Sequence, residues 1–383
     1  MFSFVGGTNS NNFVAVDIGY GMTKPMSAAG KKKSIYSCVA DAPVDDLLGG
    51  FFRPSPNDNS DDKNDDPAYD PGYLVRIIAE NENDTAISGE YLVGKAASKS
   101  PYATPVNLSP EKQPEIHDIL LLSAAYLVGA GAPAKGSTAG VSNTRLAVGL
   151  PLAFYKHQRH ALKSRLEALA ARVQINGGEE RRIDFSRVMV LPQGAGIVLV
   201  QNSLPEDGSI VLVVQAGTYT TEYILLEVKD GQPVPIEGYH NSLTTGLHLV
   251  HRAVAAEYQR LTGEPLDQAR HAIITDQALK GKPIMHNGKP LDLTPTARRA
   301  AIQTGKQVAN LINSRLSHMR SSITTTYVAG GAGMVFKDQL LKMLPAAELT
   351  EDPLFDDCKG YLYALQEAEM EAASAAEATL KEE

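Results

Sequence analysis

The chain of 383 residues is 43% hydrophobic and 21% charged, and its formal net charge is −8 at pH 7. This length has room for two domains that each bury a core, and the composition is that of a soluble globular protein. The acidic balance argues against a surface that coats nucleic acid in general. We therefore expect any DNA partner to be reached through a basic patch or an adaptor protein.

The two cysteines, Cys38 and Cys358, are far apart in the sequence, and neither belongs to a pair with metal-binding spacing. This usage predicts reduced thiols in a cytoplasmic protein. Residues 1–12 lack the charged and apolar segments of a signal peptide. The longest apolar runs, such as Ile210–Val214, are far too short to cross a membrane, so we expect no membrane span.

The stretch from Val14 to Lys24 reads VAVDIGYGMTK. It is typical of a buried strand, a glycine turn and a return strand. Glycines let backbone N–H groups approach an anion, Asp17 could hold a hydrated cation, and Lys24 could offset phosphate charge. Taken alone, the same residues also fit an ordinary β-hairpin.

The first half of the chain is expected to alternate strands with two helices. Asp41–Asp70 is rich in Asp, Asn, Ser and Pro, which predicts an exposed acidic insertion whose carboxylates do not follow a calcium-loop pattern. The other expected elements are strands near 26–39, Tyr73–Glu80, Thr85–Gly94 and Thr144–Gly149, and helices Ile116–Val128 and Phe154–Val173.

A second strand–turn–strand unit runs from Ile210 to Leu226 and reads IVLVVQAGTYTTEYILL. It repeats the plan of the first unit, with an apolar strand, a small and hydroxylic turn and a return strand. Just before it, the short strand Val188–Leu191 ends at Pro192-Gln193-Gly194, and a short helix is expected over 197–201. Two such units in one chain are more informative than either alone.

The sequence after Leu226 predicts two long helices, a third glycine turn and a helical tail. The helices are Leu247 to about Leu261, and Thr294 to about Ser317 with Thr294 as N-cap and Pro295 in the first turn. A strand at Thr324–Val328 is joined by Gly330-Gly331-Ala332-Gly333 to a helix from about Met334 to Met343, where free N–H groups could meet a phosphate or a sugar. Tyr361–Glu383 is helical by propensity.

With the three turns in view, the chain resembles the actin-like ATPases, and most closely those of the bacterial plasmid-segregation type (ParM/StbA) and related plasmid, phage and archaeal proteins. The resemblance extends from Asn12 to about Met343. It implies an α/β actin-like fold with two domains, each with a mixed five-stranded sheet flanked by helices, and a nucleotide cleft between them. The expected division is 1–190 for domain I, 191–325 for domain II, and 326–383 for a return to domain I with a C-terminal helix.

The resemblance also implies a set of site residues. Asp17 would hold Mg²⁺ through water, Lys24 would neutralise charge, and Gln193 would orient the attacking water. For Lys24 and Gln193 the alternatives are a surface lysine and a helix-capping residue. The expected nucleotide-binding residues are Asp17, Gly19, Tyr20, Gly21, Thr23, Lys24, Gly217, Thr218, Tyr219, Thr220, Gly330 and Gly331, with Gln193 and Gln215 as the catalytic positions.

The second turn departs from the family pattern, because Gln215 stands where its relatives usually carry an aspartate. An amide lacks the charge that orders magnesium waters, and losing one such group typically costs on the order of 10²–10³ in rate. The sequence thus predicts a filament-forming protein that binds ATP or GTP with Mg²⁺, hydrolyses it slowly, and positions DNA or another cargo through an adaptor. The alternatives are a small-molecule kinase of the same superfamily and a nucleotide-gated binding protein that does not polymerise.

Overall fold

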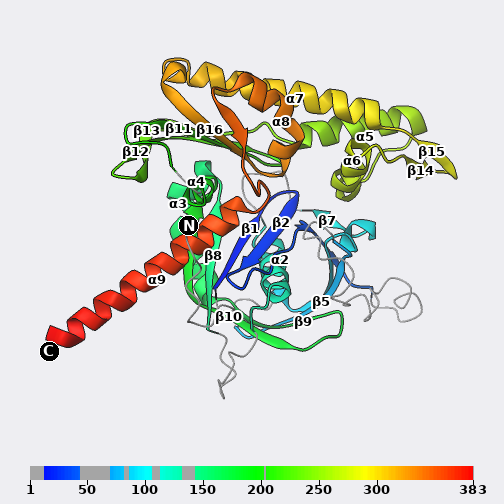
Figure 1. Ribbon diagram of the computed structural model, residues 1–383. Coiled ribbons are helices and arrows are strands. Elements are labelled where there is room, and N and C mark those ends of the chain that lie inside the picture. The colour runs from blue at the N-terminus through cyan, green and yellow to red at the C-terminus, as the bar shows by residue number, and fades with distance from the viewer. Residues whose placement is uncertain are drawn as a thin grey trace.

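The computed structural model describes residues 13–43, 70–81, 86–105, 113–131, 143–201 and 204–382, with side chains to residue 375 in the last helix. Its elements form two bodies, each built on a β-sheet covered by helices (Figure 1). Most of the expected acidic insertion, residues 44–69, lies outside the described residues, as do residues 1–12.

The first body contains a mixed sheet in the order β3-β2-β1-β8-β10, which continues through β9-β5-β6-β4-β7. β1 pairs antiparallel with β2 and parallel with β8, and β8 pairs parallel with β10. The extension arises because β10 is long: its second half pairs with β8 and its first half with β9. The strands are β1 (Phe13–Ile18), β2 (Met22–Ser27), β3 (Ile35–Tyr36), β4 (Cys38–Asp41), β5 (Tyr73–Ala79), β6 (Gly89–Val93), β7 (Thr104–Pro105), β8 (Thr144–Leu150), β9 (Ala170–Ile175) and β10 (Arg181–Pro192).

The second body contains a five-stranded sheet in the order β13-β12-β11-β16-β17. It repeats the core of the first sheet, since β11 pairs antiparallel with β12 and parallel with β16, as β1 does with β2 and β8. A small hairpin, β14–β15, stands apart from it. The strands are β11 (Ile210–Ala216), β12 (Thr221–Lys229), β13 (Gln232–Leu243), β14 (Ile284–His286), β15 (Lys289–Leu291), β16 (Ile323–Ala329) and β17 (Ala347–Leu349).

Helices bury both faces of these sheets. The most deeply buried is α2, in which Ile119–Leu122 are all almost inaccessible and pack within the first core. The helices are α2 (Pro114–Leu127), α3 (Leu152–Ala168), α4 (Ala195–Leu199), α5 (His248–Thr262), α6 (His271–Leu279), α7 (Thr294–Arg315), α8 (Gly331–Met343) and α9 (Asp356–Glu382), with short 3-10 turns at Ala97–Lys99, Gln268–Arg270 and Arg320–Ser322.

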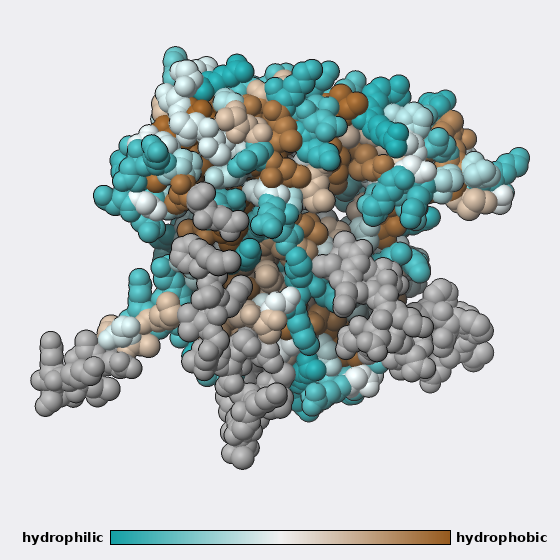
Figure 2. All heavy atoms as spheres, in the orientation of Figure 1, coloured by the Kyte–Doolittle hydropathy of each residue, from teal (hydrophilic) through white to brown (hydrophobic). Residues whose placement is uncertain are grey.

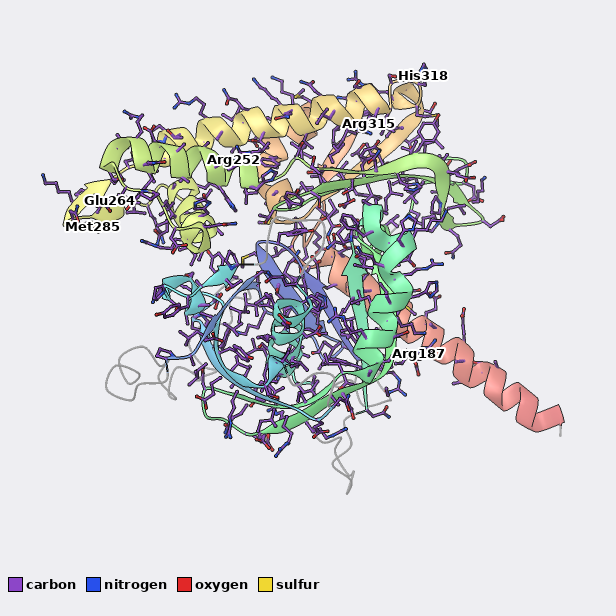
Figure 3. All side chains as sticks on the ribbon, turned by 180° about the vertical axis from the view of Figure 1, so that it is seen from behind. Arg187, Arg252, Glu264, Met285, Arg315 and His318 are labelled. Atoms are coloured by element: carbon purple, nitrogen blue, oxygen red, sulfur yellow. The ribbon has the colours of Figure 1, made fainter. Side chains whose placement is uncertain are left out.

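The last helix, α9, packs on the first body and then leaves it. Tyr361, Leu362 and Leu365 are fully buried beside β1 and β8, and Glu369 pairs with Arg145 at 2.8 Å and with Arg187 at 2.7 Å. Arg187 lies next to α9 in Figure 3. The C-terminal part of this helix runs outward, away from the sheet (Figure 1).

The surface seen in Figure 2 is largely hydrophilic over the second body, with apolar side chains in small groups between polar ones. Among the described residues Met285, in the middle of strand β14, is one of the more exposed apolar side chains, at 66%. Figure 3 places it at the far end of that body. Across all the residues that the structure describes, no helix combines the length and apolar character needed to cross a membrane.

Several expected boundaries were wrong. The helix expected at Phe154–Val173 ends at Ala168, because Ala170–Ile175 pairs with β5 and β10 as strand β9. Thr294 is not the N-cap of α7: Leu293 holds that position, and Asp292 accepts the N–H of Thr294 at 2.9 Å.

The second body also extends further along the chain than residue 325. The reason is that β16 and β17 pair within its sheet, and α8 packs in its core. The return to the first body is made by α9 alone. Asp70, placed in the exposed insertion, is buried and accepts the N–H groups of Tyr36, Gly72 and Lys95.

Candidate functional site: two matched turns over a buried polar cluster

The turn between β1 and β2 is closed by a hydrogen bond from the N–H of Gly19 to the carbonyl of Met22, 3.0 Å long. A Cβ on Gly19 would lie 2.8 Å from that carbonyl oxygen, so the turn accepts only glycine there without moving. Ser37 braces it, donating to the carbonyl of Gly19 at 2.7 Å and sharing a 2.9 Å hydrogen bond with Thr23. The Thr23 hydroxyl is therefore bonded within the first body.

The turn between β11 and β12 has the same geometry. The N–H of Gly217 donates to the carbonyl of Thr220 at 2.8 Å, as Gly19 does to Met22. The start of α5 holds this turn from behind, since the N–H of Leu247 donates to Gly217 and the N–H of His248 donates to Thr218. The two bodies thus present equivalent turns.

The two turns touch at their tips. A Cβ on Gly21 would lie 2.3 Å from Thr218 Oγ1, and the rings of Tyr20 and Tyr219 are 5.0 Å apart between centroids. Burial, together with the neighbouring Tyr219 and Glu222, raises the pKa of Tyr20 to about 12. The tips consequently meet as uncharged, closely packed surfaces.

Beneath the tips lies what we call the hinge cluster: Asp17, Lys24, Gln193, Gln215, Glu222 and Asp357. Asp17 and Lys24 are opposite each other on β1 and β2 and form a buried ion pair. Burial acts to lower the pKa of Lys24, but the adjacent Asp17 outweighs it and the pKa is raised, so the lysine stays charged. The alternative of a surface lysine was therefore wrong.

Gln193 joins this pair from the end of β10. Its Nε2 donates to Asp17 Oδ1 at 2.8 Å, which directs the amide so that Oε1 is the atom left to accept a hydrogen bond from water. The side chain is 8% exposed. Gln193 is not a helix cap, because Gly194 holds the position before α4 and no side chain caps it.

Asp357, in the first turn of α9, fixes residues 194–196, which follow Gln193 and which we call the hinge segment. It accepts the N–H groups of Gly194 and Gly196, both at 2.9 Å, and the hydroxyl of Tyr361 at 2.7 Å. Burial, and next the charge of Asp17, raise the pKa of Asp357 to about 6. The backbone of Gly360 also lies directly against Gly196, since a Cβ on Gly360 would be 2.1 Å from its carbonyl oxygen.

Gln215 and Glu222 are opposite each other on β11 and β12, so their side chains share one face of the second sheet. Gln215 lies beside the hinge segment, with Oε1 3.7 Å from where a Cβ on Gly194 would be. Glu222 Oε1 accepts the hydroxyl of Ser242 at 2.7 Å. Within the described part of the chain, Gln215 Oε1 and Glu222 Oε2 are both buried and without a hydrogen-bond partner.

The third glycine turn packs against the second hairpin. Gly330 has a φ of +89°, and a Cβ there would lie 2.3 Å from the carbonyl oxygen of Ala216. Its N–H donates to Pro353 at 2.7 Å, and α8 begins at the next residue, Gly331. The glycines thus form the start of the helix itself, where the first N–H groups are free of intrahelical partners.

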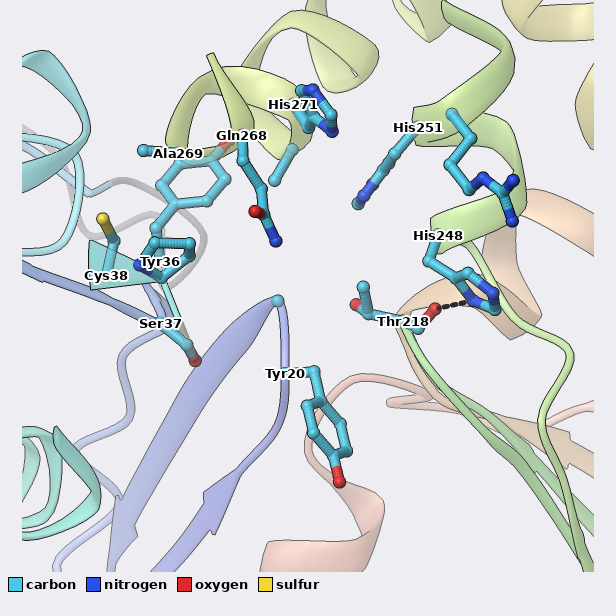
Figure 4. Close-up of a pocket in the computed structure, with 14 residues that line it drawn as sticks. Tyr20, Tyr36, Ser37, Cys38, Thr218, His248, His251, Gln268, Ala269 and His271 are labelled. Atoms are coloured by element: carbon cyan, nitrogen blue, oxygen red, sulfur yellow. Dashed lines mark hydrogen bonds between the residues drawn. The ribbon is translucent and has the colours of Figure 1, made fainter. Parts of the chain in front are cut away.

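A pocket of about 60 Å³, room for a few waters, opens beside the tips between the two bodies (Figure 4). Tyr36, Ser37 and Cys38 line it from the first body, and helices α5 and α6 and the turn before α6 line it from the second. In Figure 4 His251 and Gln268 point into the space between these walls. Burial, with His271 and His248 nearby, lowers the pKa of His251 to about 3, so this ring is neutral.

The structure thus brings together the expected residues of both hairpins, Gln193 and Gln215, and it sets Gly330 against the second hairpin. Sequence reasoning missed Glu222, Asp357 and Ser37. Glu222 was visible as an acid directly before the apolar run Tyr223–Leu226 of the return strand. Asp357 has no local signal, because it reaches the cluster from the far end of the chain. Both cysteines are free and buried, and Cys358 Sγ contacts the carbonyl of Lys24 at 3.1 Å.

Two family models match the chain over most of its length. "Actin like proteins N terminal domain" matches residues 15–196, and "Archaeal actin homologue MreB-like, C-terminal" matches residues 213–342. Archaeal actin homologs of Thermoplasma volcanium and Thermoplasma acidophilum are each 22% identical to it over 357 residues, covering 91% of this chain and 97% of each relative.

Solved structures show the same fold. A 15-stranded ParM filament from Clostridium botulinum matches with a TM-score of 0.76 and 21% identity, covering 93% of this chain and 99% of that one. An archaeal actin homolog in complex with ADP matches at 0.67 and 19%, with the same coverage. ParM of Bacillus thuringiensis with ATP matches at 0.63 and 14%, covering 94% of this chain and all of that one.

Proposed function

Because the chain is a member of the actin-like protein family, we propose that it binds ATP or GTP between its two bodies and assembles with copies of itself into a filament. One observation carries the proposal: two equivalent glycine turns, one from each sheet, meet above a buried aspartate, lysine and glutamine. Similar proteins bind ADP or ATP, and one of them forms a filament.

In this proposal the turns bind the phosphates. The N–H groups of Gly19 and Gly217 close the two turns, so the backbone N–H groups of Tyr20, Gly21, Thr218 and Tyr219 would bind the phosphates. The start of α8 at Gly330 and Gly331 would bind the rest of the nucleotide. Thr23 acts by bracing the first turn through Ser37. Because Gly21 and Thr218 are in contact, we expect the two bodies to separate before a phosphate chain can enter.

A magnesium ion fits this site through water. Both oxygens of Asp17 are already bound, by Lys24 and by Gln193, so a direct bond to Asp17 would displace one of them. Among the described residues there is no group of three or more His, Cys, Asp or Glu that could hold a metal. Mg²⁺ commonly keeps several waters and binds phosphate oxygens, where it neutralises developing charge.

Hydrolysis is expected to be slow, because Gln215 brings no charge to the second hairpin. Gln193 would orient the attacking water through Oε1, and Lys24 would stay charged beside the phosphates. Positioning and electrostatics carry most of phosphoryl transfer, so the loss of one charged group lowers the rate without abolishing binding. The cargo is proposed to be DNA or another large partner, reached through an adaptor.

The test is pelleting and negative-stain microscopy with ATP, ADP and a non-hydrolysable analogue, with GTP in parallel and phosphate release followed in the same samples. Filaments with little phosphate release are the expected result. Nucleotide binding without filaments under any of these conditions would refute the polymer and leave a gated binding protein. A chain that binds neither nucleotide would refute the whole proposal.

A further inference from the structure

The hinge cluster contains an acid that the motifs do not account for. Glu222 is 2% exposed, and Gln215, directly opposite on β11, is 8% exposed. Each presents a buried oxygen that lacks a hydrogen-bond partner within the described part of the chain, Glu222 Oε2 and Gln215 Oε1. Two acceptors with no donor between them are costly to bury. The pair therefore has a place for one donor, either a proton on Glu222 or a water.

Glu222 is held firmly from its other side. Ser242, on β13, donates to Oε1 at 2.7 Å, and hydrogen bonds from the Thr220 side chain and the Leu152 backbone also act on this carboxyl group. The charged and titratable groups that act on it are Asp357 from α9 and Tyr20 from the first turn. Glu222 therefore interacts electrostatically with a residue of the first hairpin and with the acid that binds the segment after Gln193.

We propose that Glu222 is the group that accepts the proton of the attacking water, in place of the acid that position 215 lacks. The proposal rests on the nucleotide site proposed above. Gln193 Oε1 accepts a hydrogen bond from one O–H of that water. Glu222 Oε2 accepts a hydrogen bond from the other O–H and then takes its proton. Gln215 Oε1 orients Glu222 by accepting a hydrogen bond from the protonated carboxyl group.

The step balances without a further reactant. The water oxygen forms a bond to the terminal phosphorus of the nucleotide, and the bond from that phosphorus to the bridging oxygen breaks, leaving its electron pair on the nucleoside diphosphate. One water proton moves to Glu222 Oε2 and passes later to the phosphate product or to solvent. When no water is present, a protonated Glu222 donates to Gln215 Oε1 and satisfies both oxygens.

The titration of Glu222 suits this role. Burial raises its pKa to about 7, against the hydrogen bond from Ser242. A proton acceptor works best when its pKa lies near the working pH. The rate of hydrolysis should therefore rise with pH through the neutral range and level off above it.

The test compares Glu222→Gln with the unaltered protein and with a matched control, Glu227→Gln, which removes an acid further along the same strand. A glutamine at 222 can still accept from Ser242 and can donate to Gln215, so the variant keeps the packing. We expect unchanged affinity for a fluorescent ATP analogue, phosphate release lowered on the order of 10²-fold, and a flat pH profile from 5.5 to 8.5. Glu222→Asp should keep a pH-dependent rate, because it keeps a carboxyl group.

Two results would overturn the inference while leaving the nucleotide site intact. One is phosphate release by Glu222→Gln at the unaltered rate and with the unaltered pH profile, which would mean that the Gln215 amide donates to a permanently ionised Glu222. The other is filaments that bind nucleotide and release no phosphate at any pH. If the unaltered chain binds no nucleotide at all, the proposed function fails, and this inference fails with it.

Discussion

Replacing Asp357 with asparagine removes the buried charge that anchors the hinge segment. The carboxylate accepts two backbone N–H groups and one hydroxyl, and an amide of the same shape keeps only one accepting oxygen. We expect at least one backbone N–H, that of Gly194 or Gly196, to lose its partner. An unpaired buried donor costs about 1–3 kcal/mol.

Removing the ionisable group has a second effect on stability, which offsets this cost as the pH rises. Burial raises the pKa of Asp357 in the folded state to about 6 from its ordinary value of 3.8, so the folded state binds the proton more tightly than the unfolded chain. That stabilisation is fully present below pH 3.8 and is lost as the pH rises through about 6. At about 1.36 kcal/mol per pKa unit it amounts to about 3 kcal/mol, and the asparagine variant lacks this pH dependence.

Together, the two effects predict that the difference in unfolding free energy between the unaltered protein and the Asp357→Asn variant depends on pH. Urea unfolding followed by circular dichroism should find Asp357→Asn less stable than the unaltered protein by about 1–3 kcal/mol near pH 4.5, with the gap closing by pH 7.5. Tyr361→Phe is the control, because it removes one donor to the same carboxylate and keeps the pH dependence. A gap of constant size at both pH values would show that Asp357 ionises as it does in water.

Three further substitutions test the site. Gln215→Asp should speed phosphate release, on the order of 10²-fold, and shorten filament lifetime, and an unchanged rate would mean that position 215 lies away from the reacting water. Lys24→Met leaves its carboxylate partner buried without a neutralising positive charge, so urea unfolding should show a loss of about 3–5 kcal/mol. The control, Lys229→Met at an exposed pair, should lose less than about 1 kcal/mol, and equal losses would refute the burial argument. Gly330→Ala forces a side chain onto a backbone carbonyl and should lower the unfolding midpoint and the nucleotide affinity. The control is Gly208→Ala, because Gly208 has a similar φ and open space around it, and its effect should be far smaller. Equal effects of the two substitutions would show that only φ matters.

The hairpins could be predicted because their signals are local. An apolar run followed by glycines at fixed offsets predicts both the strand and the turn. The length of the turn then sets the register, which places Asp17 opposite Lys24 and Gln215 opposite Glu222. The fold was predicted from the family resemblance that these units carry. The end of α3 could not be predicted in the same way, because only pairing with β5 and β10 decides that Ala170–Ile175 is a strand.

The parts that sequence reasoning missed depend on distant contacts. Asp357 reaches the hinge segment across more than 160 residues of chain. Asp70, at the end of a polar stretch, becomes buried because three backbone N–H groups from separate segments converge on it. Burial of an acid is decided by the donors that surround it, and composition alone does not reveal them.

The chain passes between the two bodies twice, and both passages meet at the hinge cluster. The first leaves β10 through Gln193 and α4, and the second leaves β17 and enters α9 near Asp357. They are in direct contact, since Gly360 packs on the backbone of Gly196 and Asp357 binds the two N–H groups beside it. Any separation of the bodies that admits a nucleotide must therefore turn about the segment that carries Gln193. The orientation of the amide that would hold the attacking water is in this way tied to how far the two bodies are apart, which is the variable that nucleotide binding and assembly would both change.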